Sequence, residues 1–296
     1  MLEYPIVIAE IGCNHKGELE TALEIIRVAS QFCKVDAVKF QKRNIKELMS
    51  DEEYNAPHPN PVHSYGKTYG EHREFLEFSL NQHHILKKEC EAWNVIYSSS
   101  VWDLTSAKEI SSLNPRFIKI PSASNTNFSI LDYLCENYSG EIHISLGMTT
   151  KKEEDEIVNF ILSKGRNKDT ILYACTSGYP VPDEDVCLME IRRLIEKFSS
   201  TVKAIGFSGH HKGIALDVAA FVLGAQYIER HFTLDRTWKG TDHAASVEPD
   251  GLRRIVRDLK STKDALRCKS KEILDIERKQ REKLKWNRTE LYGKVL

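Results

Sequence analysis

Residues 204–249 read AIGFSGHHKGIALDVAAFVLGAQYIERHFTLDRTWKGTDHAASVEP and decide the fold, because they belong to two apolar runs that each lead into a histidine. The first run, residues 202–207, leads into His210, and the second, residues 226–228, leads into His231. A helical pattern of small residues separates the two runs. A strand, a helix and a strand joined by short connections form a βαβ unit, whose strands are parallel neighbours about 4.8 Å apart. We therefore expect both imidazoles at one end of the sheet, close enough to bind one metal ion.

The neighbours of these histidines bear on the metal interpretation. One histidine at a strand end is usually only hydrogen-bonded, but here a glycine-bounded loop adds Asp242 and His243. Consecutive residues at a strand end point to opposite sides, so His211 should face away from the pocket that His210 faces. We expect His211 either to face solvent or to support the site from behind.

Eight apolar runs alternate with amphipathic helical patterns along the chain. This alternation predicts an α/β fold, a (β/α)8 TIM barrel, whose active site lies at the C-terminal ends of the strands. A doubly wound open sheet is the alternative. We prefer the barrel because polar residues follow nearly every run, and only closure directs all of these ends to one pocket. The runs cover residues 6–11, 37–40, 95–97, 117–120, 142–144, 171–174, 202–207 and 226–228.

Length and composition fit one domain and give no reason to expect nucleic acid or a membrane as partner. The chain has 296 residues, 41% of them hydrophobic, which is enough to bury a core, and its net charge is −1. We expect the barrel to span residues 1–268 and the charged residues 269–296 to form a helix or linker, with no second compact domain. Seven scattered cysteines without a C-x-x-C pair argue against disulfides and structural zinc and favour a reducing cytoplasm. Neither a signal peptide nor an apolar run of membrane-spanning length is present in the sequence.

Charged residues at the strand ends predict an anion site beside the histidines. Glu10 ends the first strand, which in a closed barrel lies beside the eighth, so Glu10 should lie near His231. There it would orient an imidazole, hold a metal-bound water or transfer a proton, unless it only forms an internal ion pair. Lys39 and Lys119 stand among apolar strand residues, and a buried lysine requires an anion. Two of them favour a carboxylate or phosphate ligand; ion pairs to Glu10 or Asp242 are the structural alternative.

Hydroxyl groups and a long loop extend this site. The connection over residues 42–80 exceeds an ordinary βα loop, and its Lys67, Tyr69 and Arg73 would reach an anionic or hydroxylated ligand, unless the loop is only a solvated surface segment. Neither a Walker nor a Rossmann glycine pattern is present, so neither an NTP nor a dinucleotide is implied. Short hydroxyl donors able to approach phosphate oxygens follow the third to seventh strands: Ser98, Ser99, Ser100, Ser122, Ser145, Thr176, Ser177 and Ser208.

Together these motifs resemble the sialic acid synthase family, whose members condense phosphoenolpyruvate with an N-acylated hexose. The similarity runs in order through nearly the whole barrel, and residues 66–78 and 229–249 are especially similar to the animal enzymes that use 6-phosphorylated N-acetylmannosamine. The motifs that carry the resemblance are IAEIGCNHKG (8–17), VKFQKR (38–43), GKTYGEHREFLEFS (66–79), IKIPSASNTN (118–127), ISLGM (144–148), CTSGYPVP (175–182), GFSGHHKG (206–213) and IERHFTLDRTWKGTDHAASVEP (228–249).

The resemblance implies a cytoplasmic transferase of sialic acid biosynthesis that acts on phosphoenolpyruvate and an aldose. It implies that His210 and His231 bind a divalent metal, Mn²⁺ or Mg²⁺, with Co²⁺ as a further option. The catalytic residues it implies are Glu10, Lys39, Lys119 and Asp242. Phosphoenolpyruvate would contact Lys39, Ser99, Lys119, Ser122, Ser145, Ser177 and Ser208, and the acceptor would contact Gln41, Lys67, Tyr69, Arg73, Tyr179 and Asp242.

Two departures from the family pattern concern the acceptor. Family members usually carry an acidic residue where Ser124 stands, and most continue into an antifreeze-like C-terminal domain that this sequence does not contain. The family also forms homodimers, so a homodimer is expected here. Two other functions stay open: a non-catalytic barrel subunit that binds a sugar or a partner synthase, and an aldolase that forms a Schiff base on Lys39 or Lys119.

Overall fold

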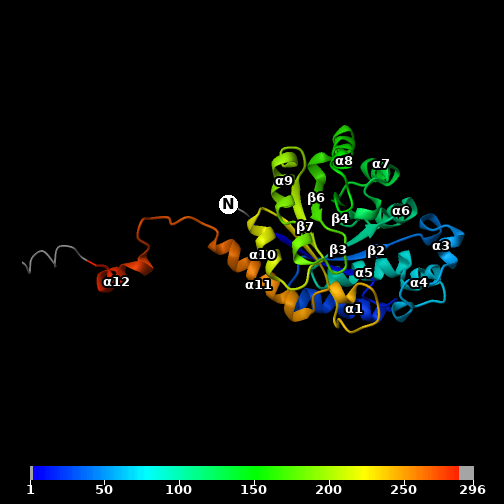
Figure 1. Ribbon diagram of the computed structural model, residues 1–296, viewed down its shortest axis with the longest axis horizontal. Coiled ribbons are helices and arrows are strands. Elements are labelled where there is room, and N and C mark those ends of the chain that lie inside the picture. Colours follow the sequence, from blue (N-terminus) through cyan, green and yellow to red (C-terminus); the bar gives the residue numbers. More distant parts are fainter. Residues whose placement is uncertain (1–2, 287–296) are drawn as a thin grey trace, which may run out of the picture.

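The computed structural model describes residues 3–286 and has eight parallel strands that close into a barrel in chain order, with β8 paired to β1 (Figure 1). Helices surround the barrel, so the predicted (β/α)8 architecture is confirmed and the open sheet is excluded. The strands are β1 (Ile6–Gly12), β2 (Ala37–Lys42), β3 (Ile96–Val101), β4 (Phe117–Ile120), β5 (Glu141–Ser145), β6 (Thr170–Cys175), β7 (Ala204–Gly209) and β8 (Tyr227–His231).

The helices pack their apolar faces on the outside of the barrel, and several begin with a capping box, as α8 does with Thr150 and Glu153. The helices around the barrel are α1 (Leu19–Arg27), which continues into a π-helical turn (Val28–Cys33), α5 (Leu80–Ala92), α6 (Leu104–Ser112), α7 (Phe128–Asn137), α8 (Lys151–Ser163), α9 (Met189–Phe198), α10 (Ala215–Val222) and α11 (Pro249–Ala265). Single 3-10 turns cover Pro61–His63, Ser122–Ser124, Asn167–Asp169, Asp183–Asp185 and His243–Ala245.

The interior of the barrel changes from apolar to polar along the strands. Ile8 and Phe117 belong to an apolar cluster inside the barrel, toward the N-terminal ends of the strands. Two residues further along the same strands, and therefore on the same face, stand Glu10 and Lys119, both buried. The strand alternation that builds the core thus also directs charged side chains to the C-terminal end of the barrel.

Most strands end later than the sequence predicted, and the third and the eighth differ most. The third strand continues to Val101 instead of ending at Tyr97, and the eighth reaches His231 instead of ending at Ile228. In both cases most of the added residues are polar or charged, residues 98–100 in one strand and residues 229–231 in the other, and sequence patterns assign such residues to loops. They stay within the strand because their inward side chains meet polar partners inside the barrel.

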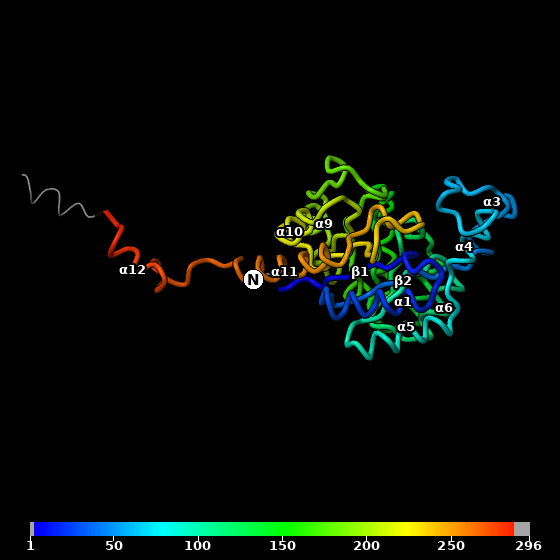
Figure 2. The backbone as a smooth tube through the Cα atoms, turned by 90° about the horizontal axis from the view of Figure 1, so that it is seen from below, coloured from blue at the N-terminus to red at the C-terminus, as the bar shows by residue number. Residues whose placement is uncertain are grey.

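The connection over residues 43–79 is more regular than expected and contains the short helices α2 (Ile45–Leu48), α3 (Asp51–Asn55) and α4 (Tyr69–Leu76). At the other end of the chain, α12 (Asp275–Leu284) stands apart from the barrel beyond α11 (Figure 2). The end of the predicted charged tail, residues 287–296, lies outside the described residues, so the division at residue 268 stays a prediction. Within residues 3–286, no helix has the length and apolar character needed to span a membrane.

Candidate active site

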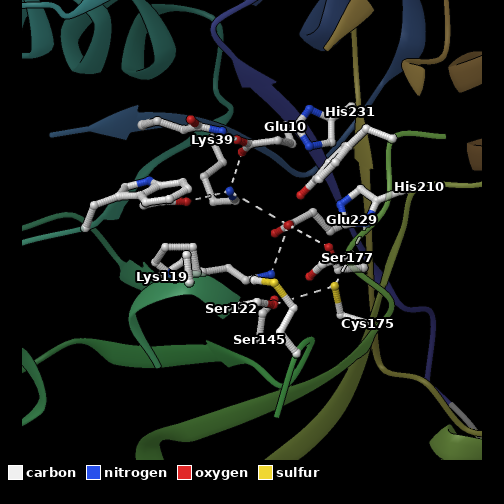
Figure 3. A pocket seen from close by; sticks show the side chains of 18 residues that line it. Glu10, Lys39, Lys119, Ser122, Ser145, Cys175, Ser177, His210, Glu229 and His231 are labelled. Carbon is white, nitrogen blue, oxygen red and sulfur yellow. Dashed lines mark hydrogen bonds and ion pairs between the residues drawn. The ribbon is translucent and has the colours of Figure 1, made fainter. Parts of the chain in front are cut away.

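A cavity of about 240 Å³ opens at the C-terminal end of the barrel, as the fold requires for an active site (Figure 3). All eight strands or the turns that follow them contribute to its wall. The residues that line it are Glu10, Lys39, Gln41, Ser100, Trp102, Lys119, Pro121, Ser122, Ala123, Ser145, Met148, Cys175, Ser177, Tyr179, Ser208, His210, Glu229 and His231. Twelve of them were predicted from the sequence as site residues: Glu10, Lys39, Gln41, Ser100, Lys119, Ser122, Ser145, Ser177, Tyr179, Ser208, His210 and His231.

Two buried lysines face the cavity, and each already has a carboxylate beside it. Lys39 pairs with Glu10, its neighbour across β1 and β2, and also donates to Ser100 Oγ at 2.8 Å. Lys119 Nζ donates to Glu229 Oε1 at 2.9 Å, and the same oxygen lies 3.8 Å from Lys39 Nζ. The structural alternative of internal ion pairs is therefore realised, with Glu229 as the second carboxylate and not Asp242. The cavity nevertheless remains open beside both ammonium groups.

Glu229 is the main residue that the sequence interpretation missed. It is 5% exposed and holds Lys119 and, at 3.0 Å, the hydroxyl of Ser208. The signal that would have found it is the spacing of two between Glu229 and His231, which places both on the inward face of one strand. Because the sequence interpretation ended this strand at Ile228, that spacing went unused.

The two carboxyl groups of the site differ in their electrostatic environment. Burial raises the pKa of Glu10, and the opposing effect of Lys39 does not cancel it. Burial acts in the same direction on Glu229, but Lys119 and Lys39 outweigh it and hold the pKa at about 2. Burial also lowers the pKa of Lys119, against the effect of Glu229. Glu229 therefore stays ionised at neutral pH, whereas Glu10 is suited to exchange a proton.

His210 and His231 lie together at the cavity wall, with ring centroids 5.4 Å apart. The predicted proximity of Glu10 and His231 is confirmed, since the two residues are paired across β1 and β8. His210 Nδ1 lies 2.9 Å from the carbonyl oxygen of Thr176 and donates to it. Burial lowers the pKa of His210, but Cys175 and this carbonyl outweigh burial and raise it. Burial lowers the pKa of His231 to about 3; His210 and Lys39 act in the same direction, and Asp242 opposes them. The buried Nδ1 of His231 has no hydrogen-bond partner among residues 3–286.

This arrangement fits a divalent metal ion. Metals bind the neutral imidazole, which is the form that burial favours for His231, whereas a metal at His210 would displace a proton. The carbonyl of Thr176 fixes the tautomer of His210 in the way that outer contacts of metal ligands usually do. In the described part of the chain, no third histidine, cysteine or carboxylate completes a cluster of three metal-binding groups with them. The pair would therefore leave the remaining coordination positions to water and substrate, as catalytic sites do.

Serine hydroxyls surround the side of the cavity near Lys119. The β5 turn has to be narrow there, because a Cβ on Gly147 would lie 2.4 Å from Ser177 Oγ and 2.7 Å from Ser122 Oγ. The Gly147 amide donates to Ser122 Oγ at 3.1 Å. Glycine thus allows backbone and hydroxyl donors to gather in one place, an arrangement suited to phosphate oxygens.

Of the three serines predicted at the end of the third strand, the one that lines the cavity is not Ser99, which the resemblance implied. Ser98 and Ser100 share the inward face of the strand, with Ser98 Oγ donating to the carbonyl of Phe117 and Ser100 Oγ accepting from Lys39. Among the described residues, Ser100 lines the cavity and Ser99 does not. Contrary to the prediction, Ser99 points to the other side of β3, because neighbouring strand residues alternate.

The predicted acceptor residues are only partly brought together. Gln41 lies at the wall and donates to Glu10 Oε1 at 2.7 Å. Asp242 lies outside the lining but close to the histidine pair, since His231 lowers its pKa against the effect of burial. Arg73 also acts on Asp242, and its guanidinium donates to Tyr69 Oη at 2.6 Å. Lys67 is exposed on the segment before α4.

Ser124 and Trp102 are linked at the edge of the cavity. The hydroxyl of Ser124 donates to the carbonyl of Trp102 at 2.9 Å, and the Trp102 ring lines the cavity. The guanidinium of Arg43 lies 4.2 Å from the centroid of that ring. Sequence patterns gave no signal for Trp102, because a single aromatic residue after a strand is equally typical of the core.

Comparisons with known proteins agree with this geometry. The model of the NeuB family matches residues 25–271. N-acetylneuraminate-9-phosphate synthase of Homo sapiens is 37% identical over 278 residues, which cover 94% of this chain and 76% of the human protein. N,N'-diacetyllegionaminic acid synthase of Campylobacter jejuni is 32% identical over 262 residues, 88% of this chain and 77% of that protein.

A solved structure supports the same relationship. The crystal structure of N-acetylneuraminic acid (sialic acid) synthetase from Leptospira borgpetersenii, in complex with citrate, superposes with a TM-score of 0.79 at 26% identity. The match covers 96% of this chain and 94% of the Leptospira chain. Fold, site and sequence relatives thus agree, and the chain belongs to the NeuB family of sugar-acid synthases, transferases that form a carbon–carbon bond to phosphoenolpyruvate.

Proposed function

We propose that this chain condenses phosphoenolpyruvate with an aldose of the N-acetylmannosamine type, free or 6-phosphorylated, to give a sialic-acid-like 3-deoxy-2-ulosonic acid and phosphate. The observation that carries the proposal is the convergence of Lys39, Lys119 and five serines on the cavity that also receives His210 and His231. An anionic donor and an acceptor carbonyl would each find suitable groups in this one space. The relatives named above support the choice of substrates.

The donor would lie along the side of Lys119. Ser122, Ser145 and Ser177 gather there with the Gly147 amide, and these short donors suit the phosphate group. Glu229 is held between the two lysines and keeps both ammonium groups in place. Charge on the donor would be offset by the lysines, whose removal should lower the rate about 10²- to 10³-fold, in the range found for comparable donors.

The acceptor would lie on the opposite side, near the histidine pair. A divalent metal, Mn²⁺ or Mg²⁺, held by His210 and His231 would supply Lewis-acid polarisation of the acceptor carbonyl. Glu10 faces the same side of the cavity and is held by Gln41, so it is placed to exchange a proton with the acceptor oxygen. Tyr179 packs its ring against both imidazoles and would limit the access of water there.

In the reaction, carbon three of phosphoenolpyruvate forms a bond to the aldehyde carbon of the acceptor. Water then adds to carbon two, and phosphate leaves as the carbon–oxygen bond breaks. The atoms of one donor, one acceptor and one water thus appear as the sugar acid and phosphate. Because both reactants must be held in one cavity, most of the contribution of the protein is orientation and charge compensation.

Phosphate release is the direct test. The purified chain would be mixed with phosphoenolpyruvate and either N-acetylmannosamine or its 6-phosphate, with Mn²⁺, with Mg²⁺ and with a chelator. We expect aldose-dependent phosphate release that the chelator abolishes and added Mn²⁺ restores. Absence of release with every aldose, from protein that binds Mn²⁺, would contradict the proposal.

One observation favours a second function, an aldolase that forms a Schiff base. Burial lowers the pKa of Lys119, and a neutral amine is the nucleophile in that chemistry. Its hydrogen bond to Glu229 opposes this by favouring the charged form. Borohydride reduction in the presence of a keto acid would trap an adduct on Lys119 if the aldolase were correct.

Assembly and cellular location complete the proposal. All seven cysteines are free, as expected in the reducing cytoplasm where we place the enzyme. We also propose a homodimer, as in the family, which sedimentation velocity would test.

A further inference from the structure

A second cluster of charged side chains lies directly behind the histidine pair, on the outer side of the barrel wall. Arg230 stands between Glu229 and His231 on β8, and because its neighbours point inward it points outward, toward the helices. There it meets His211 and Asp217, and all three side chains are buried, with exposures of 1%, 0% and 0%. His211 thus faces away from the cavity, as predicted, and supports the site from behind instead of facing solvent.

The guanidinium of Arg230 reaches several groups of the segment that follows β7. Nη1 donates to Asp217 Oδ2 at 2.5 Å, to His211 Nε2 at 2.9 Å and to the carbonyl of Gly213 at 3.0 Å. Nη2 donates to the carbonyl of His211 at 2.7 Å. We call Arg230 and Asp217 the outer clamp. One side chain of β8 thereby holds the backbone immediately beyond His210.

The contacts of the outer clamp lie just beyond the last paired residues of β7 and β8. The pairing of β7 with β8 ends at Gly209 opposite Arg230, so the strand ladder no longer fixes His210 relative to β8. On its other side, the carbonyl of His210 accepts from the Val181 amide at 3.0 Å, a contact that leads toward β6 and not toward β8. The clamp therefore ties the end of β7 to the strand that carries His231.

The cluster is poorly designed for stability alone. Arg230 Nε, Asp217 Oδ1 and His211 Nδ1 are buried and have no hydrogen-bond partner within residues 3–286. A buried ion pair recovers its desolvation cost only when its polar atoms are well satisfied, and well-packed apolar residues often do as well or better. A geometric role explains why such a pair stands at this position.

We propose that Arg230 and Asp217 are positioning residues that set the separation of His210 and His231 from outside the barrel. His210 and His231 face the cavity from neighbouring strands (Figure 3). Their ring centroids lie 5.4 Å apart, and the clamp holds this spacing before any ion is bound. The value of that spacing to catalysis rests on the proposed metal site, but the clamp can be tested without metal.

The test uses Asp217→Asn, which keeps the shape of the side chain and removes the charge that anchors Arg230. Glu154→Gln is the matched control, because Glu154 is 3% exposed and pairs with Arg193 through hydrogen bonds of 2.9 and 2.7 Å. That pair joins α8 to α9 and touches neither histidine strand end. Arg230→Lys is a second variant, which keeps the charge but reaches fewer of the acceptors, in case Asp217→Asn does not fold.

Three quantities are measured on each variant: the centroid separation of His210 and His231 in crystals without metal, the Kd for Mn²⁺ by electron paramagnetic resonance, and the KM for phosphoenolpyruvate. We expect Asp217→Asn to change the separation by more than about 0.5 Å and to weaken Mn²⁺ binding about 10- to 100-fold. Arg230→Lys should lie between the wild type and Asp217→Asn. Glu154→Gln should match the wild type, and the KM for phosphoenolpyruvate should stay within about 2-fold in all of them.

An unchanged separation in Asp217→Asn, together with a Kd within about 2-fold of wild type, would overturn the inference. Equal loss of Mn²⁺ affinity in Glu154→Gln would overturn it as well, because the effect would then follow from general destabilisation. If the wild type binds no Mn²⁺, the proposed metal site fails, and the centroid separation alone decides whether the clamp exists.

Discussion

The pairing of Lys119 with Glu229 allows the structural and the functional role of a lysine to be separated. Lys119→Met removes the ammonium group and leaves Glu229 buried. Breaking a buried ion pair from one side costs about 3–5 kcal/mol. Glu229 would keep the Ser208 hydroxyl at 3.0 Å and Lys39 at 3.8 Å, so we expect a loss near the lower end, about 3 kcal/mol. At about 2–4 °C per kcal/mol, Tm should fall by about 6–12 °C.

Adding Glu229→Gln to Lys119→Met removes the unpaired charge. The double variant should therefore recover most of the lost stability, because a neutral amide beside methionine needs far less compensation than a buried carboxylate. Activity should not recover: if Lys119 binds the donor, kcat/KM for phosphoenolpyruvate stays about 10²- to 10³-fold below wild type in both variants.

Thermal unfolding followed by circular dichroism and a phosphate-release assay would measure the two quantities on the same samples. The reasoning would be refuted if the double variant regained both stability and kcat/KM. Lys119 would then serve only to neutralise Glu229, and the cavity would not use it for an anion. A Tm unchanged in Lys119→Met would refute the energetic part alone.

Three further predictions concern other parts of the site and the core. Gly147→Ala should lower kcat/KM for phosphoenolpyruvate at least about 10-fold and destabilise the protein by about 1–3 kcal/mol, because the new Cβ displaces two serine hydroxyls. Steady-state kinetics and urea unfolding would measure the two effects, and a variant with the kcat/KM of the wild type would contradict the prediction. Ser100→Ala should raise the KM for phosphoenolpyruvate about 10-fold, whereas Ser99→Ala should leave it unchanged, and the reverse order would show that the strand faces are misassigned. Burial lowers the pKa of His15 and His83 to about 3, below the usual 6.5 of the unfolded chain. As the pH falls, the unfolded state therefore binds protons first, and each residue should lower the free energy of unfolding by about 1.4 kcal/mol at pH 5.5. Urea unfolding that is identical at pH 7.5 and pH 5.5 would exclude this.

Much of the fold could be predicted because each strand coincides with an apolar run that lies between helical patterns in the sequence. The closure of the barrel placed Glu10 beside His231, and the βαβ unit placed His210 there too, both from connectivity alone. The errors come from residues where two strand faces differ. An offset of one residue exchanges the inward and outward faces, and this separates Ser99, which the resemblance implied as a phosphoenolpyruvate contact, from Ser100, which lines the cavity.

The missed residues share a physical cause. Glu229 is charged and buried, and its presence inside a strand is understandable only when its partner is known, which lies 110 positions earlier in the chain. The loop residues Lys67 and Tyr69 have the right chemistry, but sequence does not fix where a long connection runs. The spacing of two between Glu229 and His231 indicates that both side chains point inward, but the partner of Glu229 is a property of the closed sheet that local sequence does not give.

The four charges around the cavity have a consequence for how a substrate enters. Glu10 and Glu229 pair with Lys39 and Lys119, so these four side chains together carry no net charge when all are ionised. A bound anion with more than one negative charge changes this balance. Burial already raises the pKa of Glu10, and a bound anion beside it raises this pKa further. Binding of the anion would therefore draw hydrogen ions from the buffer. The heat of binding would then vary with the ionisation enthalpy of the buffer chosen.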